Sequence, residues 1–368
     1  MEITALVRRD YGNWLPLVLS IFGVDVVCGL IVEAIHQYKA WKYSFSNKHV
    51  IITGGSSGLG LEMAKLIASE QGTVTLIARK EEQLKAAKEC VEEYCREKGT
   101  MTPHVSTEVA DVCNKGEMQN AVCNATNKNG AVDVIICNAG IAKTGYAFGQ
   151  TVEDYEQAMQ VNYMGTVNTL FCTVPSMIKR NKGEVYLVGS TCSMLSYTGY
   201  AAYAPSKYAI KGLADGLRLE LKRNNIQVGC IYPPNMDTPC LKRENETKPE
   251  EGLYVESKFE TLYSPSLIAK RVIRHIKRGD PHMYGDLDAW GVGLSNFGIG
   301  PANNFFLSVL FVIPGMIFTG AFRILLSFVY TRKRFMEEDQ RKKWVEGENM
   351  NEKLWTCLLE RVSCVLSV

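Results

Sequence analysis

Between Lys48 and Arg278 the sequence repeats one pattern, in which a short apolar run is followed by a longer segment whose apolar residues recur at helical spacing. Strands that alternate with helices in this way build a parallel sheet covered by helices on both faces. The pattern therefore predicts an α/β domain with a doubly wound parallel sheet of about seven strands. Its predicted strands include His49–Thr53, Thr73–Ala78, Val105–Val109, Val132–Cys137, Gly183–Val188 and Gln227–Tyr232.

A glycine-rich loop directly follows the first predicted strand and leads into a helix predicted from about Leu59 to Glu70. Its sequence is Gly54-Gly55-Ser56-Ser57-Gly58-Leu59-Gly60. The first, third and fourth glycines permit a tight turn, a close approach of the backbone to a pyrophosphate and close packing of the helix on the strand. The N–H groups and the dipole of the helix N-terminus would face the phosphates. We expect a Rossmann-type dinucleotide site here, with a glycine-rich turn that holds no ligand as the alternative. Its expected residues are Gly54, Ser56, Ser57, Gly58 and Gly60.

Residues at the ends of later strands indicate which dinucleotide is bound. Arg79 and Lys80 follow the second strand, where a site for NAD usually has an acidic residue that holds the ribose 2′-hydroxyl. Two cations suit a 2′-phosphate and predict NADPH, unless Arg79 is only a solvated residue. Asp111 is placed to meet the adenine ring, although an ordinary turn residue is nearly as good an interpretation. Asn138 follows the fourth strand at the ligand-binding edge, and Thr238 follows the sixth, where we expect the nicotinamide.

The stretch from Ser190 to Lys207 carries the residues expected to perform chemistry. Tyr203 and Lys207 are four apart and share one helix face if Pro205 lies in the first helical turn. A nearby ammonium favours a phenolate, so we expect Lys207 to lower the pKa of Tyr203. Ser190 is expected at the exit of the fifth strand, where its hydroxyl could bind the same substrate oxygen. By itself, such a pair could also be a chance surface feature of a helix.

Asn162 lies inside a long helix predicted from about residue 152 to residue 180. Asparagine is a poor helix-interior residue because its side chain competes for backbone hydrogen bonds. We therefore expect Asn162 to break the helical ladder and hold a water molecule, with simple tolerance as the alternative. Residues 240–263 are polar and are predicted to be irregular, as a segment that could cover the active site.

Together these motifs resemble the short-chain dehydrogenase/reductase family over about residues 48–285. The resemblance rests on Thr53-Gly54-x-x-x-Gly58-x-Gly60, Asn138-Ala139-Gly140, Asn162, Ser190 and Tyr203-x-x-x-Lys207, in that order. It implies that Tyr203 is the general acid towards a carbonyl, that Lys207 lowers its pKa and holds the nicotinamide ribose, and that Ser190 orients the carbonyl. It also implies that Asn162 supports a proton-relay water. The sequence departs from the family pattern at Gly189, where a second serine is common, and at Gln83, where a basic residue would be expected.

Within that family the sequence is most similar to membrane-bound reductases of early sphingolipid synthesis. The similarity lies in Ile77-Ala78-Arg79, in Tyr232-Pro233-Pro234-x-x-Asp237-Thr238-Pro239 and in Glu244-Asn245-x-Thr247-Lys248-Pro249. It implies NADPH-dependent reduction of the C3 ketone of 3-ketodihydrosphingosine, a long-chain amphiphilic ketone, to sphinganine at the cytosolic face of the endoplasmic reticulum membrane. The alternatives are a membrane-bound reductase of a steroid, retinoid or other lipid carbonyl, and a catalytically silent dinucleotide-binding scaffold.

Two apolar segments indicate attachment to membrane lipid. Trp14–Ile35 is long enough to cross a bilayer, although Asp25 near its middle would cost about 2.5–3.5 kcal/mol there and an interfacial or protein-packed helix is the alternative. Phe305–Tyr330 predicts either one tilted span or a re-entrant or interfacial hairpin bent at Pro314. The expected division of the chain is an anchor and linker at 1–47, a catalytic domain at 48–288, a hydrophobic membrane-associated segment at 289–335 and a polar tail at 336–368.

Composition excludes some partners and leaves others open. The net charge of +2 argues against a nucleic-acid binder, which usually carries a clustered basic excess. The 12 cysteines lack Cys-x-x-Cys spacing, which favours free thiols in a reducing compartment and no metal site. A homo-oligomer could form through the helices predicted around 152–180 and 203–222.

Overall fold

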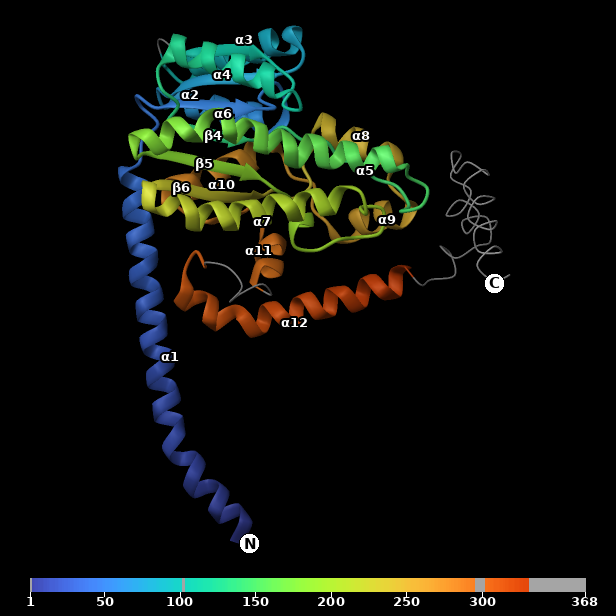
Figure 1. Cartoon of the computed structure of the whole chain (residues 1–368). Coiled ribbons are helices and arrows are strands. Elements are labelled where there is room, and N and C mark those ends of the chain that lie inside the picture. The colour runs from blue at the N-terminus through green and yellow to red at the C-terminus, as the bar shows by residue number, and fades with distance from the viewer. Residues whose placement is uncertain (1, 101–102, 295–301, 331–368) are drawn as a thin grey trace, which may run out of the picture.

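Seven parallel strands form a single sheet in the part of the chain that the structure describes, which confirms the predicted doubly wound α/β fold. The structure is a computed structural model, and it describes residues 2–100, 103–294 and 302–330. The strand order is β3-β2-β1-β4-β5-β6-β7, so the winding changes direction between β1 and β4 (Figure 1). The strands are β1 (His49–Thr53), β2 (Thr73–Ala78), β3 (Val105–Val109), β4 (Val134–Cys137), β5 (Gly183–Val188), β6 (Ile226–Tyr232) and β7 (His282–Tyr284).

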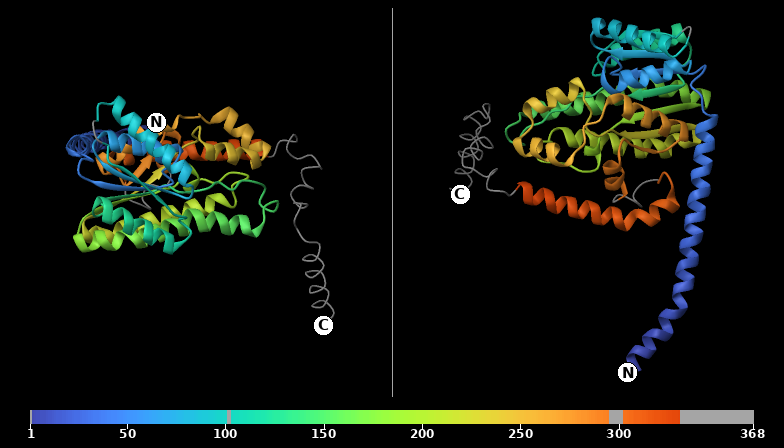
Figure 2. Two further views of the ribbon diagram at one scale, coloured as in Figure 1. Left: turned by 90° about the horizontal axis from the view of Figure 1, so that it is seen from above. Right: turned by 180° about the vertical axis from the view of Figure 1, so that it is seen from behind.

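Helices cover both faces of this sheet (Figure 2). The α-helices are α1 (Glu2–Lys42), α2 (Gly58–Ser69), α3 (Glu81–Glu97), α4 (Lys115–Asn129), α5 (Val152–Ala158), α6 (Gly165–Arg180), α7 (Tyr203–Leu221), α8 (Pro239–Thr247), α9 (Glu250–Phe259), α10 (Pro265–Arg278), α11 (Leu287–Leu294) and α12 (Phe305–Tyr330). Shorter turns of π- or 3₁₀-helix are η1 (Met159–Met164), η2 (Thr191–Ser193) and η3 (Lys222–Asn224).

The two faces of the sheet bury two separate apolar cores. In β1, Val50 and Ile52 face the core that contains α2, α3 and α10, whereas Ile51 faces the core that contains α4, α6 and α7. Successive side chains of a strand point to opposite faces, so a strand covered on both sides must be apolar throughout. This explains why the short β-branched runs predict the central strands well.

Three sequence predictions about local structure need correction. β4 begins at Val134, two residues after the predicted start at Val132. The predicted helix over 152–180 is interrupted by the π-helical turn η1, which contains Asn162. The segment 240–263 is largely helical rather than irregular, because Thr238 caps α8 by accepting a hydrogen bond from Leu241 N.

The two apolar segments have different orientations relative to the domain. α1 extends away from the domain as a long arm, while α12 lies across the underside of the domain, transverse to α1 (Figures 1 and 2). Where they meet, Asn304 Nδ2 donates to Gly29 O at 2.9 Å. By length and composition, two helices among the described residues could cross a membrane, namely Ser20–Lys42 and Phe305–Leu325.

α12 continues through Pro314 without reversing, so the predicted hairpin bent at this residue is wrong. A proline inside a helix removes one backbone hydrogen bond and bends the helix, which is far less than a reversal of the chain requires. The polar tail predicted at 336–368 lies outside the described residues, as does the end of the segment predicted at 289–335.

Candidate active site

The glycine loop has a backbone conformation and close contacts that leave no room for side chains at its glycine positions. Gly54 and Gly58 have φ angles of 63° and 55°, in the left-handed region. A Cβ at Gly54 would lie 2.8 Å from Ala139 Cα, and one at Gly60 would lie 2.6 Å from Asn138 Nδ2. The loop leads into α2, whose N-cap residue Ser57 makes no side-chain capping bond. The first-turn N–H groups and this hydroxyl therefore form a concave donor set that suits a pyrophosphate.

Asn138 supports the glycine loop from below. Its Nδ2 donates to Thr53 O at 3.2 Å and to Gly54 O at 3.0 Å, and its backbone N donates to Thr53 Oγ1 at 3.1 Å. These bonds tie the end of β4 to the end of β1, the two strands between which the winding changes direction. Ligands bind at such a point in doubly wound sheets. Asn138 thus shapes the predicted cofactor site through the backbone.

The residues predicted to select the cofactor lie at the same sheet edge. Arg79 and Lys80 follow β2, and Lys80 is the N-cap residue of α3. Arg79 Nη1 lies 4.0 Å from Asp111 Oδ2, and the Arg79 side chain is 66% exposed. Asp111 Oδ1 also accepts from Cys113 N at 2.9 Å, which is the bond of an ordinary Asx turn. Arg79 is therefore available to a ligand, whereas Asp111 has a structural bond of its own.

Tyr203 and Lys207 share the first turns of α7, as their spacing predicts. Tyr203 is the first residue of the helix, which places Pro205 in the first turn. Lys207 Nζ lies 5.7 Å from the centroid of the Tyr203 ring and donates to Val188 O at 3.0 Å. Ser190 lies two residues after the end of β5, and its Oγ accepts from Cys192 N at 3.1 Å. The Ser190 hydroxyl also lies beside the Tyr203 phenol, in the same cavity.

The electrostatics of this pair differ from the sequence prediction. Burial raises the pKa of Tyr203 well above its ordinary value, the nearby Cys192 and Glu244 add to this, and the neighbouring Ser190 hydroxyl opposes it. Burial also lowers the pKa of Lys207 to about 8. The net pKa of Tyr203 is therefore raised rather than lowered, because desolvation of the phenol is the largest effect, and a lowering contribution from Lys207 stays a prediction. A phenol with a raised pKa is protonated near neutral pH and can donate its proton.

Asn162 is fully committed to bonds inside the protein. Its Oδ1 accepts from Ile141 N at 2.8 Å, and its Nδ2 donates to Ile141 O at 3.0 Å and to Ser206 Oγ at 2.8 Å. Its backbone O accepts from Thr166 Oγ1 at 2.8 Å. The residue breaks the helical ladder as predicted and joins η1 to the loop after β4 and to α7. Its role towards a relay water stays a prediction.

A cavity of about 340 Å³ opens beside Ser190 and Tyr203. Its other walls come from the Pro233-Pro234 turn and from α8 and α9, which fold over the strand ends. Thr238 lines the cavity, and a Cβ at Gly58 would lie 3.2 Å from Thr238 Cγ2. The candidate cofactor loop and the candidate proton donor therefore meet at one site.

Sequence reasoning missed a buried polar network on α8 and α9. Tyr200 OH donates to Glu244 Oε1 at 2.5 Å, and Lys248 Nζ lies 3.1 Å from that same oxygen and 2.6 Å from Glu256 Oε2. The Lys248 side chain is only 1% exposed. The available signal was the segment Glu244–Lys248, which carries opposite charges at i,i+4 spacing. Of its i,i+4 charges, Glu244 lines the cavity and Lys248 is buried beside it.

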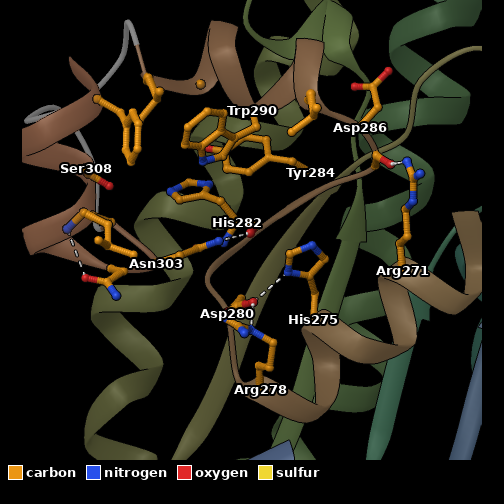
Figure 3. Close-up of a pocket in the computed structure, with 18 of the residues that line it drawn as sticks. Arg271, His275, Arg278, Asp280, His282, Tyr284, Asp286, Trp290, Asn303 and Ser308 are labelled. Carbon is orange, nitrogen blue, oxygen red and sulfur yellow. Dashed lines mark hydrogen bonds and ion pairs between the residues drawn. The ribbon is translucent and has the colours of Figure 1, made fainter. Parts of the chain in front are cut away.

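A larger cavity of about 500 Å³ lies below, between the domain, α11 and α12 (Figure 3). On one side Asp280 Oδ2 accepts from Arg278 Nε at 2.9 Å and pairs with His275 Nδ1 at 2.6 Å. On the other side Trp290 and Phe311 meet edge to face, with ring centroids 5.5 Å apart. Asp286 lines this cavity and the smaller one, so the two cavities are neighbours.

Comparison with known proteins supports one class of chemistry. The family model described as short chain dehydrogenase matches residues 48–249. A 3-ketodihydrosphingosine reductase from Dictyostelium discoideum is 32% identical over 72% of this chain and 81% of its own length. A 3-dehydrosphinganine reductase from Danio rerio is 34% identical over 63% of this chain and 69% of its own length. Among solved structures, an actinorhodin polyketide ketoreductase with NADPH has a TM-score of 0.56 and 25% identity, covering 64% of this chain and 95% of its own.

Proposed function

The chain belongs to the short-chain dehydrogenase family and is an oxidoreductase, and from this premise we propose that it reduces 3-ketodihydrosphingosine to sphinganine with NADPH. The observation that carries the proposal is the cavity in which Ser190, Tyr203 and the glycine loop meet. The names of the relatives supply the substrate. The glycines at positive φ and the uncapped N–H groups in the first turn of α2 fit the pyrophosphate of a nicotinamide dinucleotide. The dinucleotide supplies the hydride when it is bound.

Three side chains have the roles that the reduction requires. Tyr203, protonated because it is buried, donates its proton to the C3 oxygen as hydride reaches the C3 carbon, which gives the secondary alcohol. Ser190 holds the same oxygen, because its hydroxyl already lies against the phenol. Lys207, fixed by its bond to Val188 O, places a positive charge under the ring as the proton leaves.

The preference for NADPH over NADH rests on Arg79 and Lys80 at the end of β2. An exposed guanidinium and an ammonium are suited to a 2′-phosphate. Arg79→Ala should raise KM for NADPH by about 10-fold and leave KM for NADH nearly unchanged, since one charge-assisted bond is lost. Initial rates with both cofactors check this, with Lys85→Ala on the exposed face of α3 as the control. Equal effects on the two cofactors would contradict the assignment.

An amphiphilic substrate fits the position of the cavities. We place the protein in the endoplasmic reticulum membrane with its catalytic domain in the cytosol, and α1 and α12 support a membrane location. The larger cavity has an apolar wall of Leu307, Phe311 and Trp290 beside α12, and it adjoins the smaller one at Asp286. A long chain could extend from the smaller cavity towards the membrane side.

Exposed Phe171 on α6 and Leu219 on α7 support a homo-oligomer through that face, which sedimentation would test.

The test is a reduction assay with the full chain in lipid vesicles. The protein is incubated with NADPH and either 3-ketodihydrosphingosine, a steroid ketone or retinal, and the products are separated by chromatography. We expect sphinganine and little reduction of the other two carbonyls. Failure to form sphinganine while NADPH binds would refute the substrate assignment. Turnover of the steroid or of retinal instead would favour the alternative reductases.

A further inference from the structure

The walls of the smaller cavity carry an excess of negative charge. Among the described residues that line it, five are carboxylates and none is Lys, Arg or His. The carboxylates are Glu244, Glu256, Glu260, Asp286 and Asp288. Hydride transfer to a ketone gains nothing from such walls, because negative charge develops on the ketone oxygen. The excess charge therefore requires a separate explanation in the ligand.

Ion pairs to Lys248 neutralise part of this charge at Glu244 and Glu256, whereas Glu260, Asp286 and Asp288 form no ion pair with the residues that the structure describes. Lys248 lies between Glu244 and Glu256, and Tyr200 donates to Glu244. Glu260 is in a different position, because its hydrogen bond comes from a neutral amide, Asn235 Nδ2, at 2.5 Å. The same Asn235 Nδ2 also donates to Glu256 Oε1 at 3.0 Å. One amide group thus bridges two carboxylates.

The environment of Glu260 is that of an anion that lacks a counter-charge. Burial, with a smaller contribution from the negative field of Glu256, raises its pKa to about 7, while Lys248 acts in the opposite direction. Two like charges held this close disfavour each other's ionisation. A cation bound between them would reverse that effect and would also form charge-assisted hydrogen bonds.

We propose that Glu260, together with Glu256, binds the primary ammonium group that lies next to the ketone of the substrate. The inference rests on the proposed function, in which the C3 ketone is flanked by an amine at C2, and it adds the residues that would select such a substrate. The ammonium has three N–H donors. Its acceptors would be Glu260 Oε1 and Glu256 Oε1, the second of which also accepts from Asn235 Nδ2, and both carboxylates line the same cavity as Tyr203. Glu244 and Lys248 hold α8 and α9 in place around this subsite.

Substrates that differ only in the amine provide the test. The full chain in vesicles is assayed with NADPH on 3-ketodihydrosphingosine and on 1-hydroxyoctadecan-3-one, which lacks the amine. Wild-type protein should have a kcat/KM about 10- to 100-fold higher for the amino ketone, as the loss of a charge-assisted bond predicts. Glu260→Gln should remove this preference, chiefly through KM for the amino ketone, and leave the neutral ketone within about two-fold. Glu260→Asp should keep most of the preference, because it keeps the charge.

The control is Glu250→Gln, which removes the same charge from the exposed start of α9, the helix that Glu260 caps at its C-terminal end. It should leave both substrates unchanged. Equal kcat/KM for the two ketones with wild-type protein would overturn the inference and leave the proposed reduction intact, and so would an undiminished preference in Glu260→Gln. If wild-type protein reduced neither ketone, the proposed function itself would fail. If Glu260→Gln did not bind NADPH, the wild-type preference and Glu260→Asp would decide the question.

Discussion

At the scale of single residues, the candidate site combines a half-buried proton donor with a buried cation. Tyr203 and Lys207 lie on one turn of α7, and burial disfavours the charged form of each. If the phenol were exposed, the positive charge of Lys207 would be the main influence on its pKa and would lower it, as the spacing alone suggests. The raised pKa of Tyr203 comes mainly from burial, in a site where α8 and α9 form walls of the cavity. The sequence could not predict this, because it does not state how two distant segments exclude water.

Tyr203→Phe removes the proposed proton donor and changes little else. We expect kcat to fall by about 10²- to 10⁴-fold, the range for loss of a general acid, with NADPH affinity within a few fold of wild type. The measurement is single-turnover reduction together with NADPH fluorescence titration. Tyr94→Phe on α3 serves as the matched control. Turnover close to that of wild type would show that another group supplies the proton.

Lys207→Met should separate stability from function. Burial lowers the pKa of Lys207 from 10.5 to about 8, so between these values the unfolded chain holds a proton that the folded chain has lost. Stability therefore rises with pH across this window, and below it the folded protein bears the full cost of the buried ammonium, about 3 kcal/mol. We expect Met to raise Tm by about 5 °C at pH 7 and to abolish turnover. The gain in Tm should shrink from pH 8 to pH 10, and a lower Tm at pH 7 would contradict this explanation.

At the scale of elements, prediction succeeded where burial is uniform. β1, β2, β3 and β5 have the predicted bounds. β1, β2 and β5 are largely buried, as strands covered on both faces are, whereas the edge strand β3 contains Ser, Thr and Glu and is exposed at its end. α8 and α9 were not predicted as helices, because they bury charged residues such as Glu244 and Lys248 against a cavity. Their pattern resembles an exposed loop. A helix that lines a site hides its polar face, and periodicity of apolar residues does not detect this.

The contact between α1 and α10 gives a prediction for an element. Arg278 Nη2 donates to Glu33 Oε2 at 2.8 Å, and its Nε donates to Asp280, whose side chain is completely buried. Arg278→Ala should lower the free energy of unfolding by about 2 kcal/mol, because it leaves Asp280 short of a partner inside the protein. It should also expose the linker before β1 to protease. Thermal unfolding and limited proteolysis check both effects against Arg274→Ala, an exposed position on the same helix.

At the scale of the whole molecule, α12 has two different faces. Gly315 packs closely on α11, where a Cβ would lie 2.5 Å from Leu294 Cβ. Ile313, Ile317 and Ile324 recur on another side of the helix and are 66%, 67% and 60% exposed. If α1 crosses the bilayer, a transverse α12 lies along the membrane surface with these residues in the lipid and the domain above it (Figure 1). This arrangement could not be read from hydropathy, which gives the apolar content of a segment and not its direction.

An in-plane α12 predicts that the C-terminus and the catalytic domain are on the same side of the membrane. In sealed vesicles with the catalytic domain outside, an antibody should reach an epitope tag added after Val368 without detergent, whereas a tag before Met1 should be reached only after detergent is added. Reduction of added substrate by intact vesicles confirms the orientation of the domain. A spanning α12 would place the C-terminal tag inside, so protection of that tag would refute the in-plane arrangement.

Replacement of Ile313, Ile317 and Ile324 by Ser should weaken substrate capture from the bilayer, because the apolar contact of α12 with lipid is lost. We expect a higher KM for membrane-bound ketone and an unchanged affinity for NADPH.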